Sequence, residues 1–203
     1  MRMCRVKNGT WRQLAKAEAG VTAVEFGLIA PIFLLMLLGT FNLGQAVYLQ
    51  SVFHGAVQDA GRDAGLESGA SNLAAIDALV MKRVSGIAPE GAIISSRKNY
   101  TTFNDVGTAE DFEDANNNGA YDDTECFTDV NGNGTWDADR ASAGLGGADD
   151  VVVYTAELTY NWLIPMGGFL GWADTNKLTA STVLRNQPFG SQAARPEKQI
   201  CPA

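Results

Sequence analysis

The chain has 203 residues and a formal net charge of −8, with 23 acidic against 15 basic side chains. Residues 1–20 carry five basic side chains against one acidic one, and the remaining residues carry a net charge of −12 (−8 minus +4). An acidic domain without a basic patch argues against nucleic-acid binding and is compatible with hard cations. His54 is the only histidine, which excludes histidine-cluster metal sites. We expect no enzyme, because no pair of carboxylates is set apart from the acidic stretch at residues 111–140.

A long apolar run follows the basic N-terminal segment. No Lys, Arg, Asp or Glu occurs in residues 26–58. As a helix, residues 21–43 would extend about 35 Å at about 1.5 Å per residue, which is enough to cross a bilayer. A basic segment beside an apolar span predicts a cytoplasmic N-terminus and an acidic remainder on the other side of the membrane.

A secretory signal peptide is the alternative interpretation of this segment, with an apolar core that ends near Gly39. No A-x-A-like cleavage site follows it, because residues 44–46 (Gly-Gln-Ala) are a poor substitute. The apolar stretch is also longer than the core of a typical signal peptide. We therefore favour a retained single-pass anchor.

A carboxylate, Glu25, lies at the entrance to the apolar span, where an acidic side chain is costly and needs a partner. A new amine at Val21 would provide that partner if the chain were cut after Gly20. A basic leader, a Gly before the cut and a Glu at the fifth mature position resemble the type IV prepilin processing site. The resemblance implies cleavage by a prepilin peptidase, with Gly20, Val21 and Glu25 as the processing residues.

Helical periodicity continues beyond the span. Apolar residues recur at three- and four-residue steps over residues 49–64, which predicts that the same helix leaves the bilayer and packs on a soluble domain. A second amphipathic helix is predicted over 72–84. Strands are predicted over 92–96 with the neighbouring 100–103, over 150–160 and over 178–184. Residues 163–172, between the last two strands, read as an apolar loop.

The expected fold class is α+β. A long transmembrane and then amphipathic helix packs on a small antiparallel sheet, as in pilins, and the sheet domain carries an acidic insert. The expected divisions are a leader at 1–20, the helix at 21–68 and an exported domain at 69–203.

The C-terminal segment, residues 183–189, is similar to the closing segment of TadE-like minor pseudopilins of tight-adherence (Flp-type) pilus systems. The site from Gly20 to Glu25 and the small-residue helix at 56–62 resemble the same family. Gln187 departs from it, because the family commonly has Glu there. The resemblance covers most of the chain outside 104–149. It implies a pilus assembly component of the bacterial inner membrane, with a periplasmic or extracellular C-terminal domain and other pilus or pseudopilin subunits as partners.

The acidic insert, residues 111–140, contains a complete match to the calcium loop D-x-[DN]-x-[DN]-G-x5-E. The match starts at Asp114, and Gly119 takes the sharp turn. Every donor is an oxygen, which suits calcium rather than zinc or copper. The expected ligands of this first loop are Asp114, Asn116, Asn118, the Ala120 carbonyl, Asp122 and Glu125.

A second copy of the motif starts at Asp129. Arg140 occupies its closing position, so that either Asp139 supplies the missing carboxylate or the second site is weak. Tyr121 and Trp136 fall at equivalent places in the two copies, which predicts a tandem repeat with a shared small core. Both copies resemble dockerin-like or thrombospondin-like calcium loops, and a solvated acidic loop is the alternative. The expected ligands are Asp129, Asn131, Asn133, the Thr135 carbonyl and Asp137.

Two cysteines, Cys126 and Cys201, remain if the leader is removed. An exported domain permits a disulfide between them, although spacing alone leaves two unrelated thiols as an alternative. The function that we expect is that of a membrane-anchored pseudopilin-like component of pilus assembly, stabilised by calcium. The alternative is a calcium-dependent adhesin or binding protein that is anchored by an uncleaved N-terminal helix.

Overall fold

The computed structural model describes residues 19–64, 73–165, 167–171, 173–188, 190–192, 194–195 and 197–202. Nearly all of the predicted leader, and the predicted end of the first helix near residues 65–69, lie outside the described residues. The chain divides into two compact units, Met1–Ala46 and Val47–Ala203.

The first unit consists, in its described part, of the beginning of helix α2 (Ala19–Ala64). By length and composition this helix could cross a membrane, with a mean hydropathy of 2.1 over its most apolar window. Its large apolar side chains are exposed, and those of Phe26, Leu28 and Met36 are 71%, 71% and 70% exposed. A helix surface that is apolar all round matches lipid better than water.

The second unit is built on a four-stranded antiparallel sheet of order β3-β1-β4-β5. The predicted small antiparallel sheet is therefore confirmed. The first predicted strand extends to Tyr100. The last one begins already at Thr175, because its ladder with β4 includes polar positions such as Lys177, opposite Thr159. The strands are β1 (Ala92–Tyr100), β3 (Ser142–Ala143), β4 (Val151–Asn161) and β5 (Thr175–Arg185).

The strand predicted over residues 100–103 is wrong. Strand β1 ends at Tyr100, and the 3-10 helix η1 (Phe103–Asp105) follows it. The Asp105 carboxylate accepts hydrogen bonds from the backbone N–H and the hydroxyl of Thr102, at 2.9 and 2.8 Å. These local side-chain contacts replace the strand ladder, as is usual for Asp and Thr near turns.

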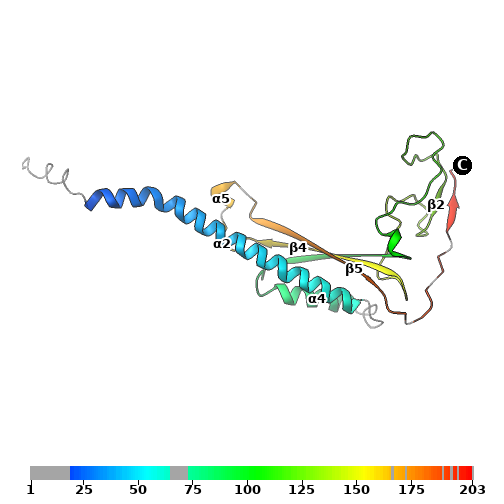
Figure 1. Ribbon diagram of the computed structural model, residues 1–203, viewed down its shortest axis with the longest axis horizontal. Coiled ribbons are helices and arrows are strands. Elements are labelled where there is room, and N and C mark those ends of the chain that lie inside the picture. The colour runs from blue at the N-terminus through cyan, green and yellow to red at the C-terminus, as the bar shows by residue number, and fades with distance from the viewer. Residues whose placement is uncertain are drawn as a thin grey trace, which may run out of the picture. The chain divides into compact units, whose positions relative to one another are not determined.

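One face of the sheet packs against the end of α2 and against α4 (Leu73–Val84), which Figure 1 shows running beside α2. Alternate residues of β4 point into this core and are buried, whereas their neighbours are only half-buried. The predicted apolar stripe on α2 and the predicted second helix are both confirmed. The buried core residues include Leu49, Phe53, Val57, Val80, Val152, Tyr154, Ala156, Leu158 and Tyr160.

The acidic insert lies between η1 and β3 in the chain. Its short strand β2 (Phe127–Asp129) pairs antiparallel with β6 (Lys198–Ile200) near the C-terminus, in a second, two-stranded sheet (Figure 1). Between β4 and β5, the predicted apolar loop contains a single helical turn, α5 (Gly167–Leu170).

Candidate cation-binding loops and membrane anchor

The two copies of the acidic motif fold into the same backbone turn. At the sixth position of each copy, Gly119 and Gly134 have φ angles of 76° and 80°. At the fourth position, Asn117 and Gly132 have φ angles of 57° and 79°. Glycine and asparagine are the residues that adopt this left-handed conformation most readily. The tandem repeat is therefore present in the backbone as well as in the sequence.

The side chains of the first loop are held by hydrogen bonds within the loop. Asp114 accepts hydrogen bonds from the backbone N–H groups of Asn118 and Gly119, at 3.1 and 2.8 Å. The amide nitrogens of Asn116 and Asn118 donate to Asp122 Oδ2, at 2.6 and 2.9 Å. Four of the predicted ligands are thus brought together in one turn of chain.

Glu125 closes the first loop and is only 4% exposed. Its Oε1 accepts a hydrogen bond from the backbone N–H of Ala115 at 2.9 Å, and its Oε2 accepts one from that of Asp122 at 3.1 Å. The carboxylate therefore bridges the second and ninth positions of the loop. Among the described residues, no lysine or arginine forms an ion pair with it.

The second loop repeats this arrangement. Asp129 accepts a hydrogen bond from the backbone N–H of Gly134 at 2.9 Å, which corresponds to the contact between Asp and Gly in the first loop. The amide nitrogens of Asn131 and Asn133 donate to Asp137 Oδ2, at 2.8 and 2.6 Å. The predicted side-chain ligands of this loop are also brought together.

Asp139 and Arg140, at the end of the second loop, both contact residues outside that loop. The Oδ2 atom of Asp139 accepts hydrogen bonds from Lys98 Nζ at 2.8 Å and the Tyr100 hydroxyl at 3.1 Å, so this oxygen is engaged by strand β1. Burial and this contact with Asp139 raise the pKa of Tyr100 to about 12. Arg140 donates from Nε to the Ala109 carbonyl at 3.0 Å.

Glu110 is the residue of this module that the sequence did not reveal. It is 1% exposed, and its two carboxylate oxygens accept hydrogen bonds from the backbone N–H groups of Val130 at 2.8 Å and Asp137 at 3.1 Å. It precedes the first loop and belongs to neither copy of the motif, so motif spacing gives no signal for it.

An aromatic cluster joins the two loops. Tyr121 and Trp136 stack with their ring centroids 4.7 Å apart and an interplanar angle of 14°. Phe112 packs edge-on against both rings, with centroid distances of 5.9 and 6.0 Å. The predicted shared small core is confirmed, and the two loops form one packed module.

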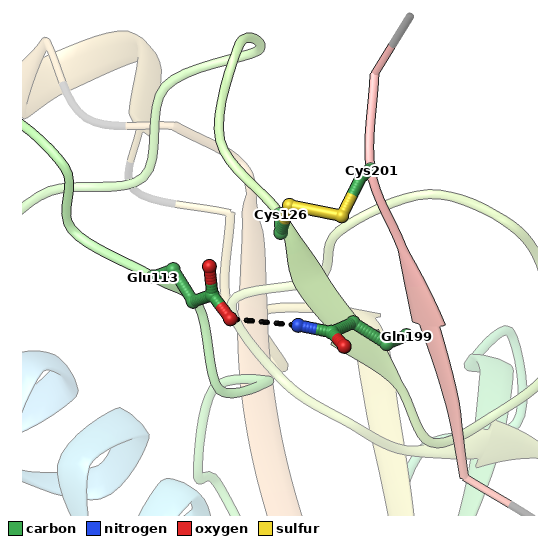
Figure 2. The surroundings of a disulfide bond; sticks show 4 residues. All are labelled: Glu113, Cys126, Gln199 and Cys201. Carbon is green, nitrogen blue, oxygen red and sulfur yellow. Dashed lines mark hydrogen bonds between the residues drawn. A yellow bond between two sulfur atoms is a disulfide. The ribbon is translucent and has the colours of Figure 1, made fainter.

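A disulfide fastens the C-terminal segment to this module. Figure 2 shows Cys126, next to the closing residue of the first loop, bonded to Cys201, and their Cα atoms are 4.2 Å apart. Beside it, the Gln199 amide donates to Glu113 Oε1 at 2.7 Å, as Figure 2 also shows. Of the two alternatives that the sequence left open, the structure has the disulfide.

The predicted processing residues lie in the first unit. Gly20, Val21 and Glu25 all belong to α2, and the side chain of Val21 lies outside the described residues. Glu25 is exposed between the exposed apolar side chains of Val24 and Phe26. This carboxylate therefore lies on the apolar surface of the helix.

Residues 20–62 match a protein-family model described as TadE-like protein. This N-terminal segment is TadE-like. The TadE-like segment begins at Gly20, and it continues through the apolar helix to the small-residue stretch that packs on the sheet. The predicted family resemblance is confirmed for this part of the chain, whereas both acidic loops lie outside the match. Comparisons with curated proteins and with solved structures gave no significant match.

The donor set beyond the TadE-like segment fits a hard cation. No group of three or more His, Cys, Asp and Glu side chains is gathered as a metal cluster in the part of the chain that the structure describes. In both loops, carboxylates alternate instead with asparagine amides. Calcium takes six to eight such oxygens in flexible geometry, whereas zinc prefers sulfur and nitrogen.

Proposed function

We propose that this protein is a membrane-anchored, pseudopilin-like component of tight-adherence pilus assembly. The observation that carries the proposal is the match of residues 20–62 to the TadE-like family, on a helix that is long and apolar enough to cross a membrane. The basic residues before Gly20 stay in the cytoplasm, and the unit from Val47 is exported across a bacterial inner membrane. Its partners are a prepilin peptidase and other pilus or pseudopilin subunits, and it has no catalytic role.

Processing after Gly20 explains the position of Glu25. The cut creates an amine at Val21, four residues before Glu25 and therefore one helical turn away on the same helix face. A carboxylate on a lipid-facing helix surface is costly, and an amine from the same or a neighbouring subunit offsets that cost. Exposed apolar side chains flank Glu25 on both sides, which supports such pairing within the bilayer.

Mass spectrometry of the N-terminus tests the processing step. Co-expression with a prepilin peptidase is expected to yield a chain that begins at Val21, and Gly20→Val is expected to block the cut. Gly27→Val is the matched control, because no atom lies within 4 Å of a Cβ built at Gly27. An intact Met1 in protein from its native membrane would contradict the proposal. A start near Tyr48, as cleavage of a secretory signal peptide would give, would also contradict it.

We further propose that the two acidic loops bind calcium and stabilise the exported unit. The support is the same left-handed turn in both loops, with carboxylate and amide oxygens at equivalent positions. The Oδ1 atoms of Asn116 and Asn118 each accept one backbone N–H, at 2.9 and 2.7 Å, and an amide oxygen has a second lone pair with which it can bind an ion. An ion that binds only the folded form raises stability by mass action.

Calorimetry and thermal unfolding of the full chain in detergent test calcium binding. Extracellular calcium modules bind at about 10⁻⁴–10⁻³ M, so millimolar calcium is expected to raise the melting temperature and chelation to lower it. Glu125→Gln is expected to weaken calcium binding. Glu113→Gln is the control, because the Glu113 carboxylate is exposed and hydrogen-bonded to Gln199. If calorimetry detects no heat of calcium binding and the melting temperature does not change in chelator, the loops are a solvated acidic segment that binds no calcium.

A calcium-dependent adhesin or binding protein is the second candidate function. The observation in its favour is that both loops lie outside the TadE-like segment. In that case the N-terminal helix is an uncleaved anchor, and the chain isolated from its native membrane is expected to retain Met1.

A further inference from the structure

We propose that Glu110 is the closing ligand of the second calcium loop. Each loop is then closed by one buried glutamate. Glu125 is the last position of the first loop, whereas Glu110 comes before both loops in the sequence. This inference rests on the proposed calcium binding, and it names a ligand that lies outside the sequence motif.

The contacts of Glu110 are equivalent to those of Glu125. Glu125 receives the backbone N–H groups of the second and ninth positions of the first loop, at 2.9 and 3.1 Å. Glu110 receives the backbone N–H groups of Val130 and Asp137, which are the second and ninth positions of the second loop, at 2.8 and 3.1 Å. In both cases each carboxylate oxygen accepts one bond. The two side chains therefore take the same place relative to the two turns.

Burial and charge give a second reason for a cation, separate from the motif. Glu110 is 1% exposed, and among the described residues no lysine or arginine forms an ion pair with it. Removing a carboxylate from water is costly, and the two backbone N–H groups offset part of that cost without supplying a full positive charge. A divalent ion held between Glu110 and the carboxylates of Asp129 and Asp137 supplies the missing charge.

The backbone around Glu110 is fixed on the second loop. Its N–H donates to the Asp137 carbonyl at 2.9 Å, and its own carbonyl accepts from Trp136 Nε1, also at 2.9 Å. Arg140, at the formal closing position, donates to the Ala109 carbonyl at 3.0 Å. Arg140 is therefore a positioning residue for Glu110. Arg140→Glu removes the contact with the Ala109 carbonyl and is therefore expected to weaken the second loop.

Calcium titration of the full chain in detergent tests the assignment, with isothermal calorimetry to count ions per chain. The wild-type chain is expected to bind two calcium ions, one per loop. Glu110→Gln is expected to lose one ion and Glu125→Gln the other, whereas Glu113→Gln is expected to keep both. Glu110→Asp retains the charge and is expected to keep both ions with a weaker second site. The Cys126–Cys201 disulfide and the aromatic circular dichroism, measured in chelator, report whether each variant is folded.

The outcomes separate this inference from the function on which it rests. A wild-type chain that binds no calcium overturns the proposed calcium binding itself. A Glu110→Gln chain that still binds two ions overturns the assignment of Glu110 alone. If Glu110→Gln does not fold, Arg140→Glu decides the question. This substitution retains the Glu110 side chain and removes the contact between Arg140 and the Ala109 carbonyl. It is expected to weaken the second site, and tighter binding would overturn the assignment.

Discussion

The carboxylate of Asp77 on α4 accepts a hydrogen bond from the hydroxyl of Tyr154 on β4, at 2.8 Å. The same carboxylate accepts a hydrogen bond from the Ser95 hydroxyl at 2.8 Å and pairs with the guanidinium of Arg97. That guanidinium also lies over the Tyr154 ring, 5.0 Å from its centroid. Helix α4 is thus tied to the two central strands by polar contacts as well as by its apolar face.

Asp77→Asn is expected to destabilise the exported unit by about 1–3 kcal/mol at pH 7, because it removes charge-assisted hydrogen bonds. Burial would raise the pKa of Asp77, but hydrogen bonds from Arg97, Tyr154 and Ser95 and the charge of Arg97 together lower it below 3.8. The stabilisation is therefore present above pH 3.8 and is lost as the pH falls through the lowered pKa.

Urea unfolding of the full chain at pH 7 and near pH 3 checks this prediction. The difference between wild type and Asp77→Asn is expected to shrink at the lower pH. Asp59→Asn is the control, because Asp59 and Arg83 form an exposed pair at 3.6 Å, of a kind that contributes little. An equal difference at both pH values would show that the charge of Asp77 does not contribute.

Gly61→Ala is expected to destabilise the packing of α2 on β5. A Cβ at Gly61 would overlap the methyl group of Thr182 and lie 3.2 Å from Leu184 Cδ2. Such overpacking costs about 1–3 kcal/mol, which outweighs the gain of about 1 kcal/mol in helix propensity. Gly55→Ala on the same helix is the control, because nothing lies within 4 Å of its Cβ, and it is expected to be neutral or stabilising. Melting temperatures of the two variants decide the question, and equal stabilisation by both would contradict the close contact at Gly61.

Cys201→Ser is expected to lower the stability of the acidic module. The disulfide to Cys126 spans 75 residues, and removing a native disulfide that closes a long stretch of chain typically costs about 2–5 kcal/mol. Thermal unfolding with and without a reductant measures the effect, with Cys4→Ser as the control for loss of a thiol. A reductant that lowers the melting temperature of Cys201→Ser as much as that of the wild type would contradict this role.

Glu25→Ala is expected to leave cleavage after Gly20 largely intact and to impair association with pilus subunits. Glu25→Gln is expected to fail in the same way, because charge rather than size pairs with an amine in lipid. Co-purification with pilus subunits, alongside N-terminal mass, measures both effects. Normal assembly with either variant would show that Glu25 only lies at the membrane interface.

The sequence by itself determined the elements that depend on local pattern. Apolar periodicity placed the stripe of α2 and the second helix, and a run of β-branched and aromatic residues placed β4. Each of these patterns is read from consecutive residues. The first acidic loop was readable for the same reason, since its six expected ligands, Asp114 to Glu125, follow one another in twelve positions.

The tertiary structure alone decided the features that join distant segments. The pairing of Cys126 with Cys201 depends on β6 lying beside β2, which spacing does not specify. Glu110 reaches the second loop from nineteen residues before Asp129, because the stacked aromatic core folds the chain back on itself. A sequence motif identifies residues only where they follow one another in a fixed order. Glu110 contacts the second loop from outside that order, so its position there is visible only in the folded structure.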